Sequence, residues 1–262
     1  MWITFYYKNK YFLYNSFMTL KVLTYNIYFN RAKNIIENII DRHQPDIICL
    51  QEVETTEMNL KNLHFKNYGL ADFSNSFIQF NRFFGLVTFY NKKRLKFIGS
   101  ENFSLPRSVI ETILLILRGP RNYRTVLKTE FYDRNNPRTK IVNYNIHLTA
   151  FGSNGTRLKQ IQETFADMKI EEKCPTIITG DFNFPYGRRK FESLIKKYQL
   201  KEATNKLFFT QIGKLFGIIP IKLKLDYILF RNIRQIKTKR IAITNSDHFP
   251  IFSTFSIETP AN

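Results

Sequence analysis

The order of apolar and polar positions along the chain predicts short strands alternating with amphipathic helices. Runs rich in β-branched and aromatic residues predict strands. They lie at 20–27, 46–50, 84–90, 94–98, 123–131, 140–146, 176–179, 225–230, 235–243 and 250–257. Apolar residues that recur every three or four positions predict helices at 31–42, 156–168 and 188–198.

The turn residues between these runs predict how the strands connect. Residues 91–93 separate 84–90 from 94–98, and the polar stretch 133–137 separates 123–131 from 140–146, so two hairpins are expected. The chain shows no internal repeat and no linker-like stretch. The mixture predicts one α/β domain over 18–258, with two packed, mostly antiparallel β-sheets flanked by helices. Met18 is a candidate native start, which would make 1–17 an extension, and 259–262 is expected to be a tail.

The composition excludes several classes of protein. Hydrophobic residues make up 44% of the chain, which is enough for a real core and argues against long disorder. Two cysteines, Cys49 and Cys174, exclude a disulfide framework and a cysteine-rich zinc site. The longest apolar stretch, 109–117, contains Glu111 and falls short of the roughly 18 residues that a membrane-spanning helix needs. The first 17 residues make a poor signal peptide, so we expect a cytoplasmic protein.

The charge predicts an anionic partner. Lys and Arg number 40 against 21 Asp and Glu, which gives a net charge of +19. Such a charge favours nucleic acid or an anionic membrane surface, although the codon bias of an AT-rich genome would produce the same excess of lysine. Basic residues interleaved with aromatics at 82–96, 118–140 and 206–240 suit nucleic acid. The stretch 215–224 instead suits a membrane surface, and no protein partner is predicted.

Polar residues with catalytic potential lie at the ends of otherwise apolar strands. They are Asn26, Glu52, His147, Asp181, Asn183, Asp226, Asp247 and His248. Each has an ordinary structural explanation when taken alone, such as a helix cap or a turn residue. Strand ends that meet at one rim are, however, where scaffolded sites are usually built, so the joint pattern carries the argument.

That pattern is a resemblance to a known family. The segments LTYNI, ICLQEVE, NYNIHL, ITGDFNFP, LDYIL and NSDHFPI resemble, in order and spacing, the motifs of the endonuclease/exonuclease/phosphatase superfamily. The resemblance covers 19–257 and implies a deoxyribonuclease-like fold, a four-layer α/β sandwich. It also implies a phosphodiesterase that uses Mg²⁺, with Mn²⁺ as a substitute. Glu52 resembles the main metal ligand of the family, with Asn26 and Asp247 close to the metal or its water.

The same resemblance suggests roles for the other residues. His248 resembles the essential C-terminal histidine and Asp226 its carboxylate partner. Asp181 and Asn183 resemble the pair that positions the attacking water and binds the phosphate. The general base is open between the His248–Asp226 pair and Asp181. His147 is expected to stabilise the transition state or protonate the leaving group.

Several substrates remain open at this stage. The first hypothesis is a phosphodiesterase acting on nucleic acid, either a DNA endonuclease or a DNA-end-processing enzyme, with Arg157 binding substrate. His147 stands where abasic-site endonucleases of the superfamily carry tyrosine, which argues against that branch. The alternative is a sphingomyelinase-like enzyme that hydrolyses phospholipids or phosphoinositides. A non-catalytic polyanion-binding module is the alternative of another class, and the complete set of site residues argues against it.

Overall fold

The computed structural model describes residues 17–79, 81–118, 124–150, 152–167, 173–215 and 218–258. Within these ranges the chain forms two six-stranded sheets and one separate hairpin. The first sheet has the order β13-β14-β1-β2-β4-β3. Its strands are β1 (Phe17–Asn26), β2 (Ile47–Glu54), β3 (Tyr68–Gln79), β4 (Arg82–Asn91), β13 (Arg234–Arg240) and β14 (Ile251–Glu258).

The second sheet has the order β5-β6-β7-β8-β12-β9. Its strands are β5 (Leu95–Ser104), β6 (Thr125–Asp133), β7 (Lys140–His147), β8 (Thr176–Asp181), β9 (Lys201–Glu202) and β12 (Asp226–Arg231). The hairpin consists of β10 (Gln211–Leu215) and β11 (Ile219–Leu223). Each large sheet holds one parallel pair, β1 with β2 and β7 with β8, and every other pairing is antiparallel.

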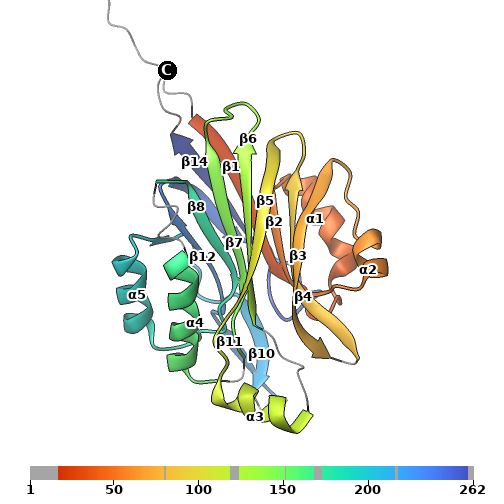
Figure 1. The fold of residues 1–262 in the computed structure, drawn as a ribbon, viewed down its shortest axis with the longest axis vertical. Helices are drawn as coiled ribbons and strands as arrows, with labels where there is room; N and C mark the ends of the chain where they lie inside the picture. Colours follow the sequence, from red (N-terminus) through yellow and green to blue (C-terminus); the bar gives the residue numbers. More distant parts are fainter. Residues whose placement is uncertain are drawn as a thin grey trace, which may run out of the picture.

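Helices cover both outer faces of the paired sheets (Figure 1). A short 3-10 turn, η1 (Lys33–Ile35), leads into α1 (Ile36–His43), which with α2 (Glu57–Asn62) lies on the side of the first sheet. The second sheet is covered by α4 (Asn154–Asp167) and α5 (Arg188–Lys197). The remaining helix, α3 (Val109–Arg118), lies at one end of the molecule. The predicted fold class, a four-layer α/β sandwich with mostly antiparallel sheets, is confirmed.

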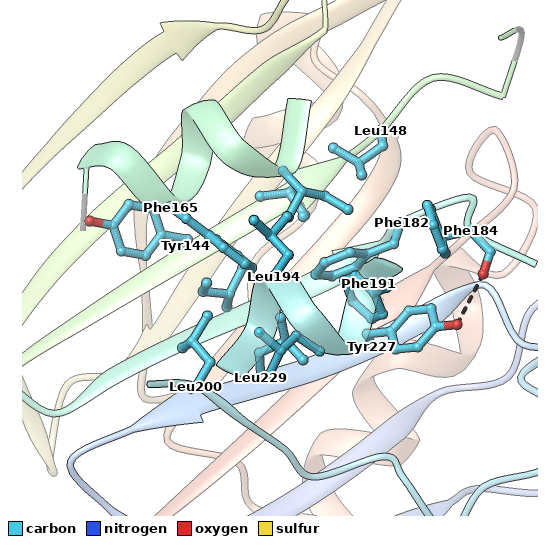
Figure 2. Close-up of a cluster of buried hydrophobic side chains, with 14 of the residues drawn as sticks. Tyr144, Leu148, Phe165, Phe182, Phe184, Phe191, Leu194, Leu200, Tyr227 and Leu229 are labelled. Carbon is cyan, nitrogen blue, oxygen red and sulfur yellow. Dashed lines mark hydrogen bonds between the residues drawn. The ribbon is translucent and has the colours of Figure 1, made fainter. Parts of the chain in front are cut away.

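Three apolar clusters hold these layers together. One lies between the two sheets and includes Leu20 and Val22 of β1 with Phe131, Ile141 and Ile177 of the second sheet. Another packs α1 on the first sheet. The third packs α4 and α5 on the second sheet through a set of rings and aliphatic side chains, in which the Tyr227 hydroxyl donates to the backbone carbonyl of Phe184 (Figure 2). Neither cysteine forms a disulfide within the part of the chain that the structure describes.

One predicted hairpin is wrong. Residues 84–90 and 94–98 do not pair with each other, because β4 pairs with β2 and β3 whereas β5 pairs with β6 in the other sheet. The turn at 91–93 therefore carries the chain from one sheet to the other. Local turn chemistry does not distinguish this crossover from a hairpin, since the partner of each strand is chosen by distant residues.

The second predicted hairpin is confirmed, because β6 and β7 pair antiparallel from Val126 with Ile146 to Tyr132 with Lys140. Tyr123, Met168, residues 1–16 and the tail 259–262 lie outside the described residues. The patterns along the sequence do not predict β3, α2, α3 or the β10–β11 hairpin as regular elements. Among the described residues, no helix has both the length and the apolar character needed to cross a membrane.

Candidate active site

The strand ends that carry polar residues meet at one edge of the sandwich. Asn26 ends β1, Glu52 lies near the end of β2, and His147 and Asp181 end β7 and β8. Because β1 and β2 are parallel, as are β7 and β8, the carboxyl ends of each pair share an edge of their sheet. Asp226 begins β12 and stands directly opposite Asp181 in the antiparallel pairing. The sheets thus place residues from distant parts of the chain around one centre.

Asp181 lies in the middle of this group of side chains. Its Oδ2 accepts a hydrogen bond from Asn26 Nδ2 at 3.1 Å, and it lies 3.6 Å from His147 Nε2 and 3.7 Å from His248 Nε2. All of these side chains are almost fully buried. The backbone amide of Asn183 donates to the other carboxylate oxygen of Asp181 at 2.8 Å, which fixes the orientation of the carboxylate.

Glu52 approaches the same centre from the first sheet. Its Oε1 accepts from Asn26 Nδ2 at 3.1 Å and lies 3.8 Å from His147 Nε2. The pairing of β2 with β4 shifts between Leu50 and Val53, and Glu52 in this bulge has a φ of 56°. A bulge interrupts the alternation of side chains between the two faces of a sheet and so redirects a side chain. A non-glycine residue at positive φ is strained, and contacts with the surrounding structure must stabilise it.

Asn145 holds that bulge from the opposite sheet. Its Nδ2 donates to the backbone carbonyls of Leu50 and Val87, each at 3.1 Å, on the two strands whose ladder is interrupted. Its Oδ1 accepts from Gln51 Nε2 at 2.8 Å. Asn145 is fully buried and lies two residues before His147 on β7. Asn145 is not among the site residues that the sequence predicts, although a polar side chain at a core position of NYNIHL is a signal for such a role.

His248 is fixed by a carboxylate on its other side. Its Nδ1 lies 2.8 Å from Asp226 Oδ2, and its backbone amide donates to Ser246 Oγ. Burial lowers the pKa of His248, but the charges of Asp226 and Asp181 outweigh burial and raise the pKa to about 10. The imidazole is therefore positively charged at neutral pH.

His147 has the opposite electrostatic character. Burial, together with the positive charges of Arg124 and His248, holds the pKa of His147 well below its ordinary value. Burial also raises the pKa of Asp181. The charge of His248 opposes this effect, whereas repulsion from the neighbouring carboxylates adds to it, and the resulting pKa is about 7. The site thus pairs one charged imidazole with one neutral imidazole, on either side of a carboxylate that can take up a proton near neutral pH.

The structure also places the other predicted residues. Asp247 lies beside the centre, and its carboxylate accepts from Gln211 Nε2 at 2.9 Å and from Ser246 Oγ at 3.3 Å. The Asn183 side chain donates to the carbonyl of Leu148 at 3.0 Å. Arg157 is the exception, because its guanidinium donates to the carbonyls of Thr149 and Ala150 and to Asn154 Oδ1. These contacts show Arg157 bracing the loop after β7 and give no support to the predicted contact with substrate.

A buried ion pair beside the site was not foreseen. Arg124 Nε donates to Glu111 Oε1 at 3.2 Å, and Thr149 Oγ1 donates to the same oxygen at 2.7 Å. The Arg124 guanidinium lies 5.4 Å from the centre of the Phe77 ring, which in turn packs edge-on against His147. Arg124 is 5% exposed, and its charge acts on both Glu52 and His147. An isolated arginine outside the motifs gives no signal for this role in the sequence.

Comparison with known proteins decides the family. The model of the endonuclease/exonuclease/phosphatase family matches residues 23–248. This chain belongs to that family. No curated protein sequence matches the chain.

Solved structures of the endonuclease/exonuclease/phosphatase fold resemble the chain over most of its length. A family protein from Bacteroides thetaiotaomicron has a TM-score of 0.73 at 16% identity, covering 93% of this chain and 100% of its own. The 2′,3′-cyclic phosphatase ANGEL2 has a TM-score of 0.70 at 13% identity, covering 93% and 96%. A mannosyl-6-phosphatase of Bacteroides thetaiotaomicron has a TM-score of 0.67 at 17% identity, covering 90% and 99%. At these sequence identities, the structural similarity shows only that the fold is shared. Membership of the endonuclease/exonuclease/phosphatase family makes the chain a phosphoester hydrolase.

Enzymes of the endonuclease/exonuclease/phosphatase family are generally metal-dependent, and the residues here fit a cation. Glu52 Oε2 is buried and has no hydrogen-bond partner within the described ranges, and burial raises the pKa of this carboxyl above its ordinary value. A cation at that oxygen would satisfy it. Asp181, Asp226 and His248 form a second buried group, with ligand atoms within 4.8 Å of one another. At this second group a cation would have to displace the proton that His248 carries, because only neutral histidine binds a metal. Glu52 is therefore the better ligand.

Proposed function

We propose that the protein hydrolyses phosphodiester bonds with the help of Mg²⁺ bound at Glu52. The observation that carries this proposal is the position of Asp181 Oδ2, which lies within 3.7 Å of His147 Nε2 and His248 Nε2. Two imidazoles, a carboxylate that can bind a proton and a metal-binding carboxylate can supply the proton transfers and charge stabilisation that phosphodiester hydrolysis needs.

Glu52 is the proposed metal ligand, with Asp247 and Asn26 beside it. Oxygen ligands suit Mg²⁺, and one carboxylate is enough because the ion keeps several waters. When bound, the cation would neutralise charge that develops on the phosphoryl oxygens. In this structure Asn26 turns its amide nitrogen toward Glu52 and Asp181, while its oxygen accepts from the backbone of Tyr28. Asn26 therefore holds the two carboxylates in place.

Each remaining residue has a role in the hydrolysis. A water oxygen adds to phosphorus, the bond to the leaving oxygen breaks, and one proton passes from the water to the leaving oxygen. Asp181 accepts the proton of the water, and Asn183 orients Asp181 through its backbone amide. His248, charged and held by Asp226, binds the phosphoryl oxygens. Neutral His147 donates a hydrogen bond to the transition state. Asp181 is the preferred base because the pKa of His248 is raised to about 10, so that imidazole already carries its proton.

Nucleic acid is one candidate substrate class. Its support is the net charge of +19 and the basic segments that flank the site. ANGEL2, which shares the fold, is known in complex with adenosine-2′,3′-vanadate. The mannosyl-6-phosphatase shows that the same fold also serves a sugar phosphate, so the fold does not choose the substrate. The choice of Mg²⁺ and a cytoplasmic location stay predictions from the sequence.

A phospholipid or phosphoinositide is the second candidate. It is favoured by large aliphatic side chains that are exposed on α3 and on the β10–β11 hairpin. A non-catalytic binding module has no observation in its favour, because the described site keeps its carboxylates and both histidines.

The experiment is a substrate panel with and without Mg²⁺. It includes supercoiled plasmid, single-stranded DNA, 5′-tyrosyl DNA, abasic duplex, sphingomyelin, a soluble phosphoinositide and bis(p-nitrophenyl) phosphate. We expect turnover that stops with EDTA and in the variants Glu52→Gln and His248→Ala. Turnover that survives EDTA or both substitutions would overturn the proposed mechanism.

A further inference from the structure

Exposed large apolar side chains gather in a few segments of the described chain. Of the 14 such residues, four lie on α3, four lie between Phe208 and Ile219, and one is Tyr186, in the loop after Asp181 and Asn183. The members on α3 are Val109, Ile110, Ile113 and Ile116, and the others are Phe208, Ile212, Ile218 and Ile219. We call these nine residues the apolar rim. Scattered apolar residues on a surface are ordinary, but a concentration of this kind marks an interaction site.

The part of the apolar rim on α3 is tied to the catalytic centre. Val109, Ile113 and Ile116 follow a helical spacing, and Val109 and Ile116 are more than three-quarters exposed. The opposite side of the helix is held by Glu111, which accepts from Thr149 Oγ1 at 2.7 Å. Thr149 lies two residues after His147. The exposed helix is therefore fixed directly to the strand end that carries a catalytic histidine.

The β10–β11 hairpin is tied to the centre from another direction. The side chain of Gln211 donates to Asp247 at 2.9 Å, and the backbone amide of Ile212 donates to the carbonyl of Asp247 at 2.8 Å. Gln211 also forms a β-bridge with His248. Figure 1 shows α3 and this hairpin at the same end of the long axis of the molecule. Two exposed apolar segments thus stand beside the catalytic centre, each braced by a site loop.

The two segments of the sequence that carry most of the apolar rim are basic. Residues 105–124 contain four arginines and a single acid, Glu111, which is buried and paired with Arg124. Residues 206–224 contain four lysines and no acid, and one of these lysines, Lys224, pairs with Glu202. Exposed aliphatic side chains among basic ones are typical of a peripheral protein that binds the surface of an anionic membrane and inserts apolar side chains into it.

We propose that the apolar rim docks on an anionic lipid membrane and that the substrate is the phosphodiester of a lipid headgroup. This inference rests on the proposed phosphodiesterase activity and names its substrate class. Docking would bring the headgroup phosphate to the centre formed by Glu52, Asp181 and His248 without removing the lipid from the bilayer. Nucleic acid accounts for the basic residues equally well. It does not account for the apolar rim, because seven of its nine residues are aliphatic and bases stack on aromatic rings.

The test measures binding to vesicles by co-sedimentation, using the full chain. Vesicles of phosphatidylcholine alone are compared with vesicles that contain about 30% phosphatidylserine, which gives the negative surface potential of a cytoplasmic leaflet. We expect binding to the second kind only. The substitutions Ile113→Glu and Ile219→Glu should each reduce the partition coefficient by about tenfold or more, because a charge replaces a group that enters the apolar layer.

Ile236→Glu is the matched control. Ile236 is 54% exposed, close to the 50% of Ile113 and the 55% of Ile219, but it lies on β13 outside the apolar rim. Its vesicle binding should equal that of the wild type. All three variants should unfold at the wild-type temperature, since an exposed substitution loses no core packing.

A soluble substrate separates this inference from the proposed activity. Bis(p-nitrophenyl) phosphate needs no membrane, so Ile113→Glu and Ile219→Glu should hydrolyse it at the wild-type rate while losing turnover of vesicle lipids. If the wild type does not hydrolyse bis(p-nitrophenyl) phosphate, the proposed function is refuted. Vesicle binding is measured separately and still tests whether the apolar rim docks on a membrane. Hydrolysis of the soluble diester without vesicle binding, or binding and cleavage of duplex DNA that neither substitution changes, would overturn the membrane proposal.

Discussion

Asp226 Oδ2 lies 2.8 Å from His248 Nδ1, on the side of the imidazole away from Asp181. The carboxylate therefore sets both the orientation and the charge of His248. We predict that Asp226→Asn lowers kcat by about 10²- to 10⁴-fold, because the imidazole loses the partner that keeps it charged. Steady-state kinetics on a soluble diester measure this effect.

The double variant Asp226→Asn/His248→Ala is the control for that assignment. Residues that act as one unit are not additive, so the double variant should be no slower than His248→Ala alone. Full activity of Asp226→Asn, or losses that simply multiply, would show that the two residues act separately.

Asn145 is predicted to support metal binding without touching the metal. Asn145→Ala leaves the carbonyls of Leu50 and Val87 without their donor, which should lower the free energy of unfolding by about 2–4 kcal/mol. The bulge that directs Glu52 should also loosen, and the Mg²⁺ concentration for half-maximal activity should rise by about tenfold or more. Denaturant unfolding and a metal titration measure the two effects.

Asn143→Ala is the matched control for this variant. Asn143 is equally buried on β7, but its side chain donates to Thr129 Oγ1 and Cys49 Sγ instead of the bulge. It should lose stability while keeping the wild-type metal requirement. An equal change of the metal requirement in both variants would contradict a specific role for Asn145.

Gly180, just before the proposed base Asp181, is predicted to tolerate no side chain. Its φ is 138°, and a Cβ atom would lie 1.9 Å from the backbone carbonyl oxygen of Ile146 on β7. Gly180→Ala should therefore lower the free energy of unfolding by about 3 kcal/mol or prevent folding. Gly99→Ala serves as the control, since no atom lies within 4 Å of the position that its new methyl group would take. Equal thermal stability of the two variants would refute this account of the β7–β8 pairing.

Glu202 should make part of the stability depend on pH. It accepts hydrogen bonds from Arg188 and from Lys224 Nζ at 2.7 Å. Burial acts to raise the pKa of Glu202, but these two cations outweigh it and hold the pKa below the usual 4.5. Because the folded-state pKa is depressed, this stabilisation is complete above pH 4.5 and disappears as the pH falls through the folded-state value.

The variant Glu202→Gln tests this dependence. At pH 7 it should be less stable than the wild type by about 2 kcal/mol, since Lys224 loses its carboxylate partner while Arg188 keeps its pair with Glu192. The difference should shrink as the pH falls below 4.5. Urea unfolding of both proteins across that range measures it, and a difference that stays constant with pH would contradict the ion-pair account.

The sequence predicted the layers of the fold, and it pointed to the residues that gather in the candidate site, for a physical reason. Asn26, Glu52 and His248 stand next to strongly apolar runs, so a local pattern marks both the strand and its functional end. The parallel pairing of β1 with β2 and of β7 with β8 then brings those ends together.

The remaining features depend on contacts that no local pattern encodes. The turn at 91–93 looks like a hairpin turn, yet β4 and β5 belong to different sheets. Arg124 and Glu111 meet across 13 positions, and Asn145 reaches a bulge 95 positions away. The exposure of α3 also could not be predicted, because an apolar run of that composition is equally typical of a buried helix.

The most direct test of the proposed activity is the Mg²⁺ dependence of bis(p-nitrophenyl) phosphate hydrolysis by Glu52→Gln. Glu54→Gln is the control, since Glu54 lies two residues away on β2 and pairs with Arg82 outside the centre. The account predicts Mg²⁺-dependent turnover in the wild type and the control, and a loss of about 10²-fold or more in Glu52→Gln that excess Mg²⁺ does not restore. Wild-type turnover by Glu52→Gln, with an unchanged metal requirement, would contradict it.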